Sequence, residues 1–517
     1  MAKNIIICSD GTGNHSNKDR GTNVFKLYEA VDLHNQHEQV SIYDDGVGTN
    51  KIKFIRILGG ALGIGLSRNV RHLYIALARV YQPGDKIFLF GFSRGAFTVR
   101  FLAGLINTVG IIDIKNSAIN SDAELRARAY QAFREYRKLS RATLEHVYAP
   151  IVDAFKVLLG LIYTRFYWAK GANKFRDEFS VPYAKEDNPI HFIGVWDTVC
   201  AVGFPLSDLS GLFNDHVYHF TFCDHHLNPY IKNAYHALSI DDQRKTFSPY
   251  LWNNTAIPDE PEDDKQARKN QTIEQVWFSG VHSNVGGGYP KHGMSLVALN
   301  WILRKAESCG MAIIELDKKQ YNAHQNVNDK LYDSRSGMNF IYRFAPRDIF
   351  QLCHNYNFPV HIHASVFNRI IRKTGGYAPG NIPAKFEVVD SEEEKCKWPD
   401  ISQKMQIELG NDSSFLSRVK NHIFARVWLN RIFLVTLFYL LYRSLPDDLC
   451  QKGITGTIGF LLSKEFSDSL MNQSLWIYGV LIFCFISSIL AKRTMQTCVS
   501  EFWYKLIREY FPGYKSS

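Results

Sequence analysis

The feature that most constrains the fold is a short run in which an apolar stretch leads through a glycine-flanked serine into a helical pattern. The segment from Lys86 to Thr98 reads K-I-F-L-F-G-F-S-R-G-A-F-T, with Ser93 between Gly91 and Gly95. A G-x-S-x-G sequence between a strand and a helix forms a sharp turn that leaves the serine oxygen exposed at the sheet edge. The run therefore predicts an elbow that presents Ser93 as a nucleophile. The alternative is an ordinary glycine-rich turn.

The rest of the first 310 residues alternates between short apolar runs and helical patterns. Such alternation predicts a mostly parallel sheet with helices on both faces. Together with the elbow, this pattern favours an α/β-hydrolase-like fold. The expected strands are Asn4–Cys8, Gln39–Tyr43, Lys86–Phe90, Ile190–Trp196 and Thr272–Phe278, and the expected helices are Asn23–His34, Ser67–Val80 and Ser295–Ser308.

The alternation breaks between residues 116 and 187, where a basic helical stretch, Ala123–Glu145, precedes an apolar one, Ile151–Trp168. We interpret 116–187 as a helical insertion that lies above the sheet and acts as a lid. A catalytic domain is accordingly expected over residues 1–315. Residues 316–420 form a mixed region that the pattern does not assign, and a helical region is expected over 421–517.

Two apolar segments in the C-terminal region, Val427–Leu445 and Leu475–Ala491, are close to the length that a bilayer requires. Basic residues precede the first and follow the second, which predicts a hairpin with both termini and the catalytic domain on the cytoplasmic side. An amphipathic tail, Phe502–Phe511, is expected at the membrane interface. The alternative is a pair of core helices in a soluble domain. The N-terminus lacks the pattern of a signal peptide.

Charge and cysteine content exclude several classes of protein. The formal charge is +10, but the densest basic stretches adjoin apolar segments, which favours an anionic membrane surface over nucleic acid. The nine cysteines are scattered and form no CxxC pair, so the sequence predicts neither a disulfide framework nor a zinc site. No metal or other cofactor is expected.

A serine nucleophile needs a base, and the base needs a carboxylate that orients it. In this fold the three follow in the order Ser, acid, His. Asp197 ends the strand that closes at Trp196, so it is the best candidate for the acid. A turn-forming role for Asp197 is the alternative reading, and Asp241 and Asp242 are the rival acids.

The best candidate for the base is His282, which lies in a glycine-rich loop directly after the strand Thr272–Phe278. A loop of this kind permits the tight path that would bring an imidazole to the serine. Most histidines have structural or surface roles. The alternatives are His225, His226, His236 and His292.

An oxyanion hole in this fold combines a backbone N–H just after the nucleophile with one from the loop after the first strand. Arg94 is the first candidate donor, and Gly11 or Thr12 supplies the second. Asp10 either makes a simple turn or braces the loops around the active site.

Seven motifs together resemble one bacterial family, the phospholipase effectors of type VI secretion systems, whose catalytic part is a divergent α/β-hydrolase. The resemblance covers roughly residues 1 to 305. The motifs are Ser9-Asp-Gly-Thr12, Thr22-Asn-Val24, Gly46-Val-Gly-Thr49, Gly91-Phe-Ser-Arg-Gly-Ala-Phe97, Val195-Trp-Asp-Thr-Val199, His236-Ala-Leu-Ser-Ile-Asp-Asp-Gln-Arg244 and Gly280-Val-His-Ser-Asn-Val-Gly-Gly-Gly-Tyr289.

The resemblance implies that Ser93 is the nucleophile, Asp197 the acid and His282 the base, in agreement with the argument from chain order. It also implies a glycerophospholipid substrate that loses a fatty acid from one of its two acyl positions, and an immunity or secretion partner protein. One departure is Asn284, where the family usually has aspartate. Because asparagine is uncharged, any role of a negative charge at position 284 is in doubt in this chain.

Two other functions stay open at this stage. The chain could be a membrane-tethered esterase or thioesterase that acts on soluble acyl substrates. It could also be an inactive membrane scaffold that has kept a hydrolase fold, because a fold does not by itself imply an activity.

Overall fold

The computed structural model describes most of the chain. The described residues are 2–11, 21–34, 38–45, 66–115, 119–144, 170–199, 226–255, 257, 260–390, 403, 407, 413–446, 460 and 463–510. Among the predicted features, Thr12, the motif Gly46–Thr49, the apolar segment Ile151–Trp168 and His225 lie outside them.

The centre of the fold is an eight-stranded sheet with the order β2-β1-β3-β4-β5-β6-β7-β8. Every neighbouring pair runs parallel. Its strands are β1 (Asn4–Ser9), β2 (Gln39–Asp44), β3 (Lys86–Phe92), β4 (Ile190–Trp196), β5 (Asn233–Ser239), β6 (Thr272–Phe278), β7 (His361–His363) and β8 (Glu387–Val389). Since all strands run the same way, their carboxyl ends share one edge, where ligand sites of such sheets lie.

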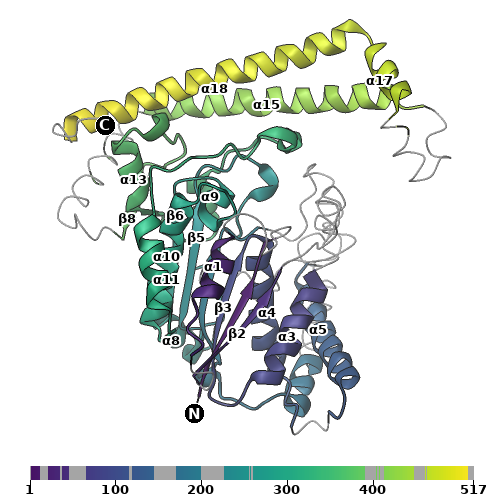
Figure 1. The fold of residues 1–517 in the computed structure, drawn as a ribbon, viewed down its shortest axis with the longest axis vertical. Helices are drawn as coiled ribbons and strands as arrows, with labels where there is room; N and C mark the ends of the chain where they lie inside the picture. The colour runs from purple at the N-terminus through teal and green to yellow at the C-terminus, as the bar shows by residue number, and fades with distance from the viewer. Residues whose placement is uncertain are drawn as a thin grey trace.

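The two faces of the sheet are covered by different helices (Figure 1). Side chains alternate along β1, so that Ile5 and Ile7 join the core under α3 (Leu66–Val80), α4 (Arg94–Val109) and α5 (Asp122–Leu144). Ile6 and Cys8 join the opposite core with α1 (Asn23–Ala30) and α10 (Gly293–Ser308). Strands buried on both faces are apolar throughout, which explains the continuous apolar runs of β1 and β3.

The architecture confirms the predicted α/β-hydrolase-like fold, a mostly parallel sheet between helices. Within the helical insertion, α5 packs beside α3 and α4 on the flank of the sheet. The strand β5 corrects the prediction, because it lies between Trp196 and Thr272, where the sequence predicts no strand. The further strands β7 and β8 come from residues 316–420, for which the sequence predicts no fold. They are only three residues long each, too short for a periodic signal.

Two long helices at the C-terminus, α15 (Ser413–Arg443) and α18 (Leu475–Tyr510), pack side by side across one end of the catalytic domain (Figure 1). The short helix α17 (Lys464–Met471) lies near their far end. Both long helices are apolar enough to cross a membrane by length and composition. Only 22% and 11% of their most apolar windows are buried, far less than in core helices of a soluble domain.

The half of the hairpin nearest the catalytic domain is packed against protein. Trp503, Leu506 and Ile507 are almost fully buried in a core that includes Phe415 of α15 and Tyr377. The indole N–H of Trp503 donates to the carbonyl oxygen of Pro379 at 2.9 Å. The prediction of a tail at the membrane interface is therefore wrong for these apolar side chains, because they are buried in a protein core and are not available to contact lipid.

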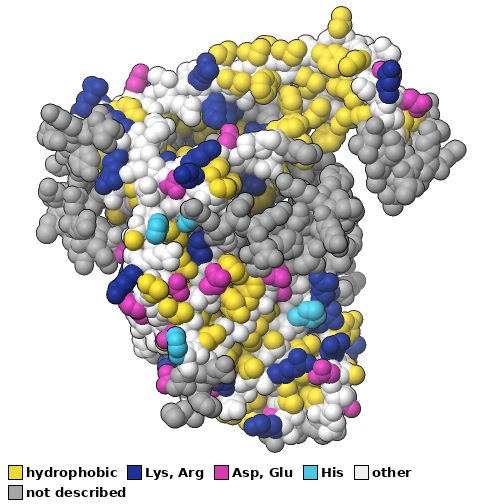
Figure 2. Space-filling view, in the orientation of Figure 1, with side chains coloured by type: hydrophobic (Ala, Val, Ile, Leu, Met, Phe, Trp, Pro, Cys, Tyr) yellow, Lys and Arg dark blue, Asp and Glu magenta, His cyan; other side chains and the backbone are white. Residues whose placement is uncertain are grey.

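The other half of the hairpin exposes its apolar side chains. Figure 2 shows hydrophobic atoms gathered along the hairpin toward its α17 end. We call residues 428–443 and 475–490 the distal hairpin. Its exposed large apolar side chains are Trp428, Ile432, Val435, Phe438, Tyr439, Tyr442, Leu475, Trp476, Ile482, Phe483, Phe485, Ile486, Ile489 and Leu490.

Candidate active site

Ser93 lies at the turn between β3 and α4 with a backbone φ of 58°, in the region that side-chain-bearing residues rarely adopt. A Cβ on Gly91 would lie 2.6 Å from the carbonyl oxygen of Gly95. A Cβ on Gly95 would lie 2.0 Å from the carbonyl oxygen of Ser9. Because Gly91 and Gly95 have no Cβ, β3, α4 and the loop after β1 can pack closely next to Ser93.

The structure brings Ser93, His282 and Asp197 into one hydrogen-bonded chain. The Nε2 atom of His282 is 2.7 Å from the Oγ atom of Ser93, and its Nδ1 atom is 2.5 Å from Oδ2 of Asp197. All three residues are buried, with Asp197 fully so and Ser93 7% exposed. The distance between His282 and Ser93 lies within the range in which a base can take a proton from a nucleophile.

Asp197 follows β4 with a φ of 42° and accepts five hydrogen bonds. Besides His282, the donors are the backbone N–H and hydroxyl of Ser239 and both terminal nitrogens of Arg347, at 2.6 and 2.8 Å. Burial by itself raises the pKa of Asp197, but the Arg347 charge and these hydrogen bonds hold it well below its usual range. Asp197 is therefore an ionised acceptor.

The rival acids Asp241 and Asp242 lie beside the site, but their carboxylates accept hydrogen bonds from backbone N–H groups. Asp241 accepts from the N–H of Gly280 at 2.6 Å, and Asp242 accepts from the N–H of His282 at 3.2 Å. Burial raises the pKa of Asp241 to about 6, although the Gly280 hydrogen bond opposes the shift. Both carboxylates thus anchor the loop that carries the imidazole, whereas Asp197 contacts the imidazole.

The ring of His282, the first residue of α9 (His282–Gly286), lies between two aromatic rings. The Phe92 centroid is 4.6 Å away and the Phe247 centroid 5.1 Å away. Burial lowers the pKa of His282, although the hydrogen bond to Asp197 opposes this. The imidazole is consequently held in place and kept neutral, as a base requires.

None of the rival histidines in the described part of the chain bonds to Ser93. His226 and His292 are half-buried and contact backbone carbonyls. His236 is fully buried, and its Nε2 accepts from the N–H of Thr198 at 3.1 Å. Burial first, and then the charge of Arg100, lower the pKa of His236 to about 3. Neutral His236 therefore fixes the turn that follows Asp197.

The loop after β1 is braced by Asp10, the second of the two roles expected for it. Its carboxylate accepts from the hydroxyls of Thr22 at 2.6 Å and Tyr43 at 2.8 Å, and from the Gly11 N–H at 2.6 Å. The close approach of Gly95 places this loop beside the elbow. Arg94 begins α4, so its N–H lies at a helix N-terminus, where negative charge is stabilised.

The departure at Asn284 has a structural explanation. Its side-chain amide donates to the Lys330 carbonyl oxygen at 3.0 Å, and its oxygen accepts from the Tyr332 N–H at 3.3 Å. A carboxylate could not make the first of these hydrogen bonds, because an ionised carboxylate has no hydrogen to donate. Asn284 thus ties the His282 loop to a segment beyond the expected catalytic domain.

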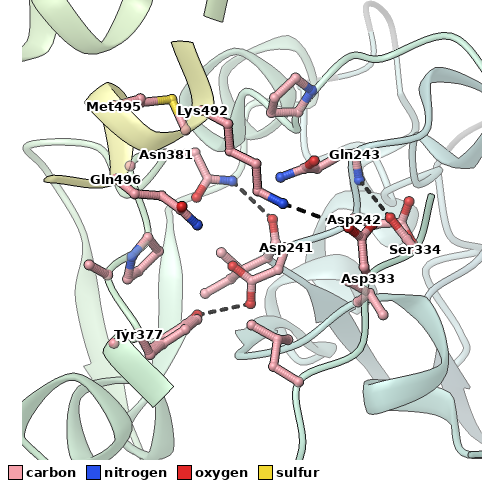
Figure 3. Close-up of a pocket in the computed structure, with 18 of the residues that line it drawn as sticks. Asp241, Asp242, Gln243, Asp333, Ser334, Tyr377, Asn381, Lys492, Met495 and Gln496 are labelled. Carbon is pink, nitrogen blue, oxygen red and sulfur yellow. Dashed lines mark hydrogen bonds and ion pairs between the residues drawn. The ribbon is translucent and has the colours of Figure 1, made fainter. Parts of the chain in front are cut away.

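A pocket of about 280 Å³ separates the His282 loop from the hairpin (Figure 3). Asp241 and Val281 line it on one side, and Lys492 and Met495 of α18 line it on the other. The ammonium of Lys492 lies 3.7 Å from the Asp333 carboxylate. The base of the hairpin is therefore fixed close to the loop that carries the imidazole.

Arg347 is the principal site residue that sequence reasoning missed. It lies 150 residues after Asp197, in the unassigned region, and no local motif marks it. The sequence presents His236 only as a rival base, because its supporting contact with the Thr198 N–H depends on tertiary structure.

A parallel sheet with helices on both faces, a strained serine at a strand–helix elbow, and an aspartate and a histidine after the carboxyl ends of β4 and β6 define the α/β-hydrolase-like class. The chain belongs to the family described as "T6SS, Phospholipase effector Tle1-like, catalytic domain", whose model matches residues 3–305. The predicted resemblance is thereby confirmed, and a phospholipase-type hydrolase domain is indicated.

Other similar proteins add little about function. An uncharacterized protein of Saccharomyces cerevisiae is 27% identical over 264 residues, which cover 47% of this chain and 32% of that protein. The chain thus spans about a third of that relative. An uncharacterized protein from Pseudomonas aeruginosa with a crystal structure is 14% identical, with a TM-score of 0.30, over 94% of this chain and 66% of that one.

Proposed function

We propose that the protein is a serine phospholipase of the A type, which hydrolyses acyl esters of membrane glycerophospholipids. The observation that carries the proposal is the hydrogen-bonded chain from Ser93 through His282 to Asp197. Membership in a phospholipase effector family supports the substrate class. An ionised carboxylate, a neutral imidazole and a serine in this order are the parts that acyl transfer needs.

In the proposed reaction, the Oγ atom of Ser93 attacks the ester carbonyl carbon while His282 takes the hydroxyl proton. The tetrahedral intermediate then collapses, the glycerol oxygen leaves with the proton from His282, and the acyl group stays on Ser93. Water then attacks the acyl carbon while His282 takes its proton. Collapse of this second intermediate releases the fatty acid, and the proton passes from His282 to the Oγ atom of Ser93. Asp197 stabilises the imidazolium at both stages.

The negative charge that develops on the ester oxygen needs donors placed in advance. We assign one donor to the backbone N–H of Arg94, at the N-terminus of α4. The second is assigned to the loop after β1, at Gly11 or Thr12. In the structure the Gly11 N–H contacts Asp10, so its use would require that short contact to rearrange.

We further propose that the distal hairpin enters the bilayer and holds the site near its substrate. Its apolar side chains are exposed, as a lipid-facing surface requires, and its base packs on the catalytic domain. A tethered site meets lipid at a high local concentration. The catalytic domain and both termini are assigned to the cytoplasmic side from the distribution of basic residues. The described helix of the insertion, α5, packs into the core on the flank of the sheet, so no lid role is assigned to it.

The test is product analysis on vesicles of phosphatidylethanolamine and phosphatidylglycerol. Wild-type protein should release fatty acid and lysophospholipid in equal amounts, and Ser93→Ala should release neither. A fluorophosphonate probe should label wild type at Ser93 only. The same vesicles, compared with a short-chain soluble ester, separate a phospholipase from a tethered esterase.

Two results would contradict the proposal. Release of diacylglycerol or phosphatidate would show cleavage at a phosphate ester and exclude an acyl-enzyme. Full activity of Ser93→Ala would exclude this serine as the nucleophile. Labelling of Ser93 without lipid turnover would favour a hydrolase for another acyl substrate.

A further inference from the structure

The triad carboxylate is shared between the imidazole and a buried guanidinium. Arg347 donates to both oxygens of Asp197, through Nη1 at 2.6 Å and Nη2 at 2.8 Å. The side chains of Arg347 and Asp197 are 3% and 0% exposed, so water does not screen their attraction. A planar guanidinium matches a carboxylate in this two-point geometry, which fixes orientation as well as charge.

Arg347 also ties together the segments around the site. Its Nη1 donates to the carbonyl oxygen of Ser239, at the end of β5, and its Nη2 donates to that of Phe247. Phe247 in turn packs edge-on against the ring of His282. Arg347 therefore positions Asp197, the end of β5, and Phe247, whose ring packs against His282.

We propose that Arg347 is a positioning residue which orients Asp197 and, by its charge, keeps His282 neutral and available as a base under acidic conditions. The inference rests on the proposed function, since it assigns Arg347 to the same triad. Arg347 lies outside residues 3–305, so the family-model match does not include it.

The direction of the effect follows from the charge of the group as a whole. The Asp197–His282 pair is negative before it binds a proton and neutral afterwards. With Arg347 added, the same step goes from neutral to positive in a buried site, and proton binding is correspondingly weaker. Removal of the guanidinium charge should therefore strengthen proton binding by the pair, whichever of the two residues carries the proton.

Other titratable and charged groups lie around the pair. Burial raises the pKa of Asp241, which anchors the His282 loop through Gly280, to about 6, and Arg347 is among the charges that oppose this shift. Asp242 and Arg244, which follow β5, form a bidentate ion pair whose opposite charges largely offset each other near His282. His236 on β5 is held neutral because burial, and then the charge of Arg100 on α4, lower its pKa to about 3. Arg347 is thus the cation that touches Asp197 directly.

The test is the pH dependence of the second-order rate at which a fluorophosphonate probe labels Ser93, because one labelling event needs no turnover. Arg347→Gln removes the charge, and the midpoint of its acidic limb should rise by about one pH unit or more. Arg347→Lys keeps the charge but loses the two-point geometry, so its midpoint should stay near that of wild type while the plateau rate falls.

Arg369→Gln is the matched control. It also removes a buried guanidinium, one that donates to the Asp329 carbonyl oxygen at 2.8 Å and does not contact the triad. It should lower thermal stability without moving the acidic limb. This control separates a loss of packing from a loss of charge beside Asp197.

Each outcome is decisive. An unshifted limb in Arg347→Gln, with wild type labelled normally, would overturn the role of Arg347 and leave the triad standing. An equal shift in Arg347→Lys would also overturn it, since the charge would then not be the cause. If Arg347→Gln does not fold, a limb that stays in place in Arg347→Lys supports the proposal and a shifted one overturns it. Wild type without labelling would instead refute the proposed function.

Discussion

The most direct structural prediction concerns Gly95→Ala, in the second position of α4. Helix propensity alone would stabilise the variant by about 1 kcal/mol, because alanine is the better helix former. The added Cβ would, however, lie 2.0 Å from the Ser9 carbonyl oxygen and 2.5 Å from that of Asp10, whereas real Cβ atoms essentially never come within 3.0 Å. Both neighbours are backbone, so α4 and the β1 loop must separate by about 1 Å, at a cost of about 1–3 kcal/mol.

A separation of this size would move Ser93 relative to His282 and disturb the oxyanion region. A misplacement of about 1 Å at reacting groups costs roughly 100-fold in rate. We expect kcat/KM for a soluble ester to fall by about two orders of magnitude, with a lower Tm. Gly479→Ala in α18 is the control, since nothing lies within 4 Å of its Cβ. Wild-type activity and Tm in Gly95→Ala would refute the reasoning.

Three further predictions follow from the site and the hairpin. Ser93→Ala should lower ester turnover by about three orders of magnitude or more while the Tm, measured by thermal denaturation, stays close to that of wild type; a small loss would contradict the triad. Because burial lowers the pKa of His282, the midpoint of the acidic limb of kcat/KM should lie below pH 6.5, and a midpoint above 6.5 would contradict this. Phe483→Ser combined with Ile486→Ser should weaken vesicle binding about tenfold or more but spare soluble ester hydrolysis. Leu316→Ser, an exposed leucine of α11 (Glu315–His324), is the control, and equal loss in both proteins would exclude a membrane role for the hairpin.

Much of the sheet could be predicted from the sequence because its strands are buried on both faces. The apolar runs at Asn4–Ser9 and Lys86–Phe92 can be recognised as strands without knowledge of the strands that pair with them. The order Ser, acid, His along the chain places the acid and the base after later strands. The strand β5 escaped prediction although it is also buried, because the polar residues Asn233, His236 and Ser239 interrupt its apolar run. The strands β7 and β8 escaped prediction because three residues carry no periodic signal. Their place at the sheet edge depends on pairing with β6, not on their own sequence.

The sequence by itself determined the elbow at Ser93, since glycines flank the serine between a strand and a helix, and the helical and apolar character of the two C-terminal segments. Tertiary structure decided which of three aspartates contacts His282, because the choice depends on where the loop after β6 lies relative to the ends of β4 and β5. It also decided that Trp503 enters a core, and that Arg347 reaches Asp197 across 150 residues of chain. The pattern of apolar and charged residues shows which side chains require burial or a hydrogen-bond partner, whereas the packed fold determines which residue provides that contact.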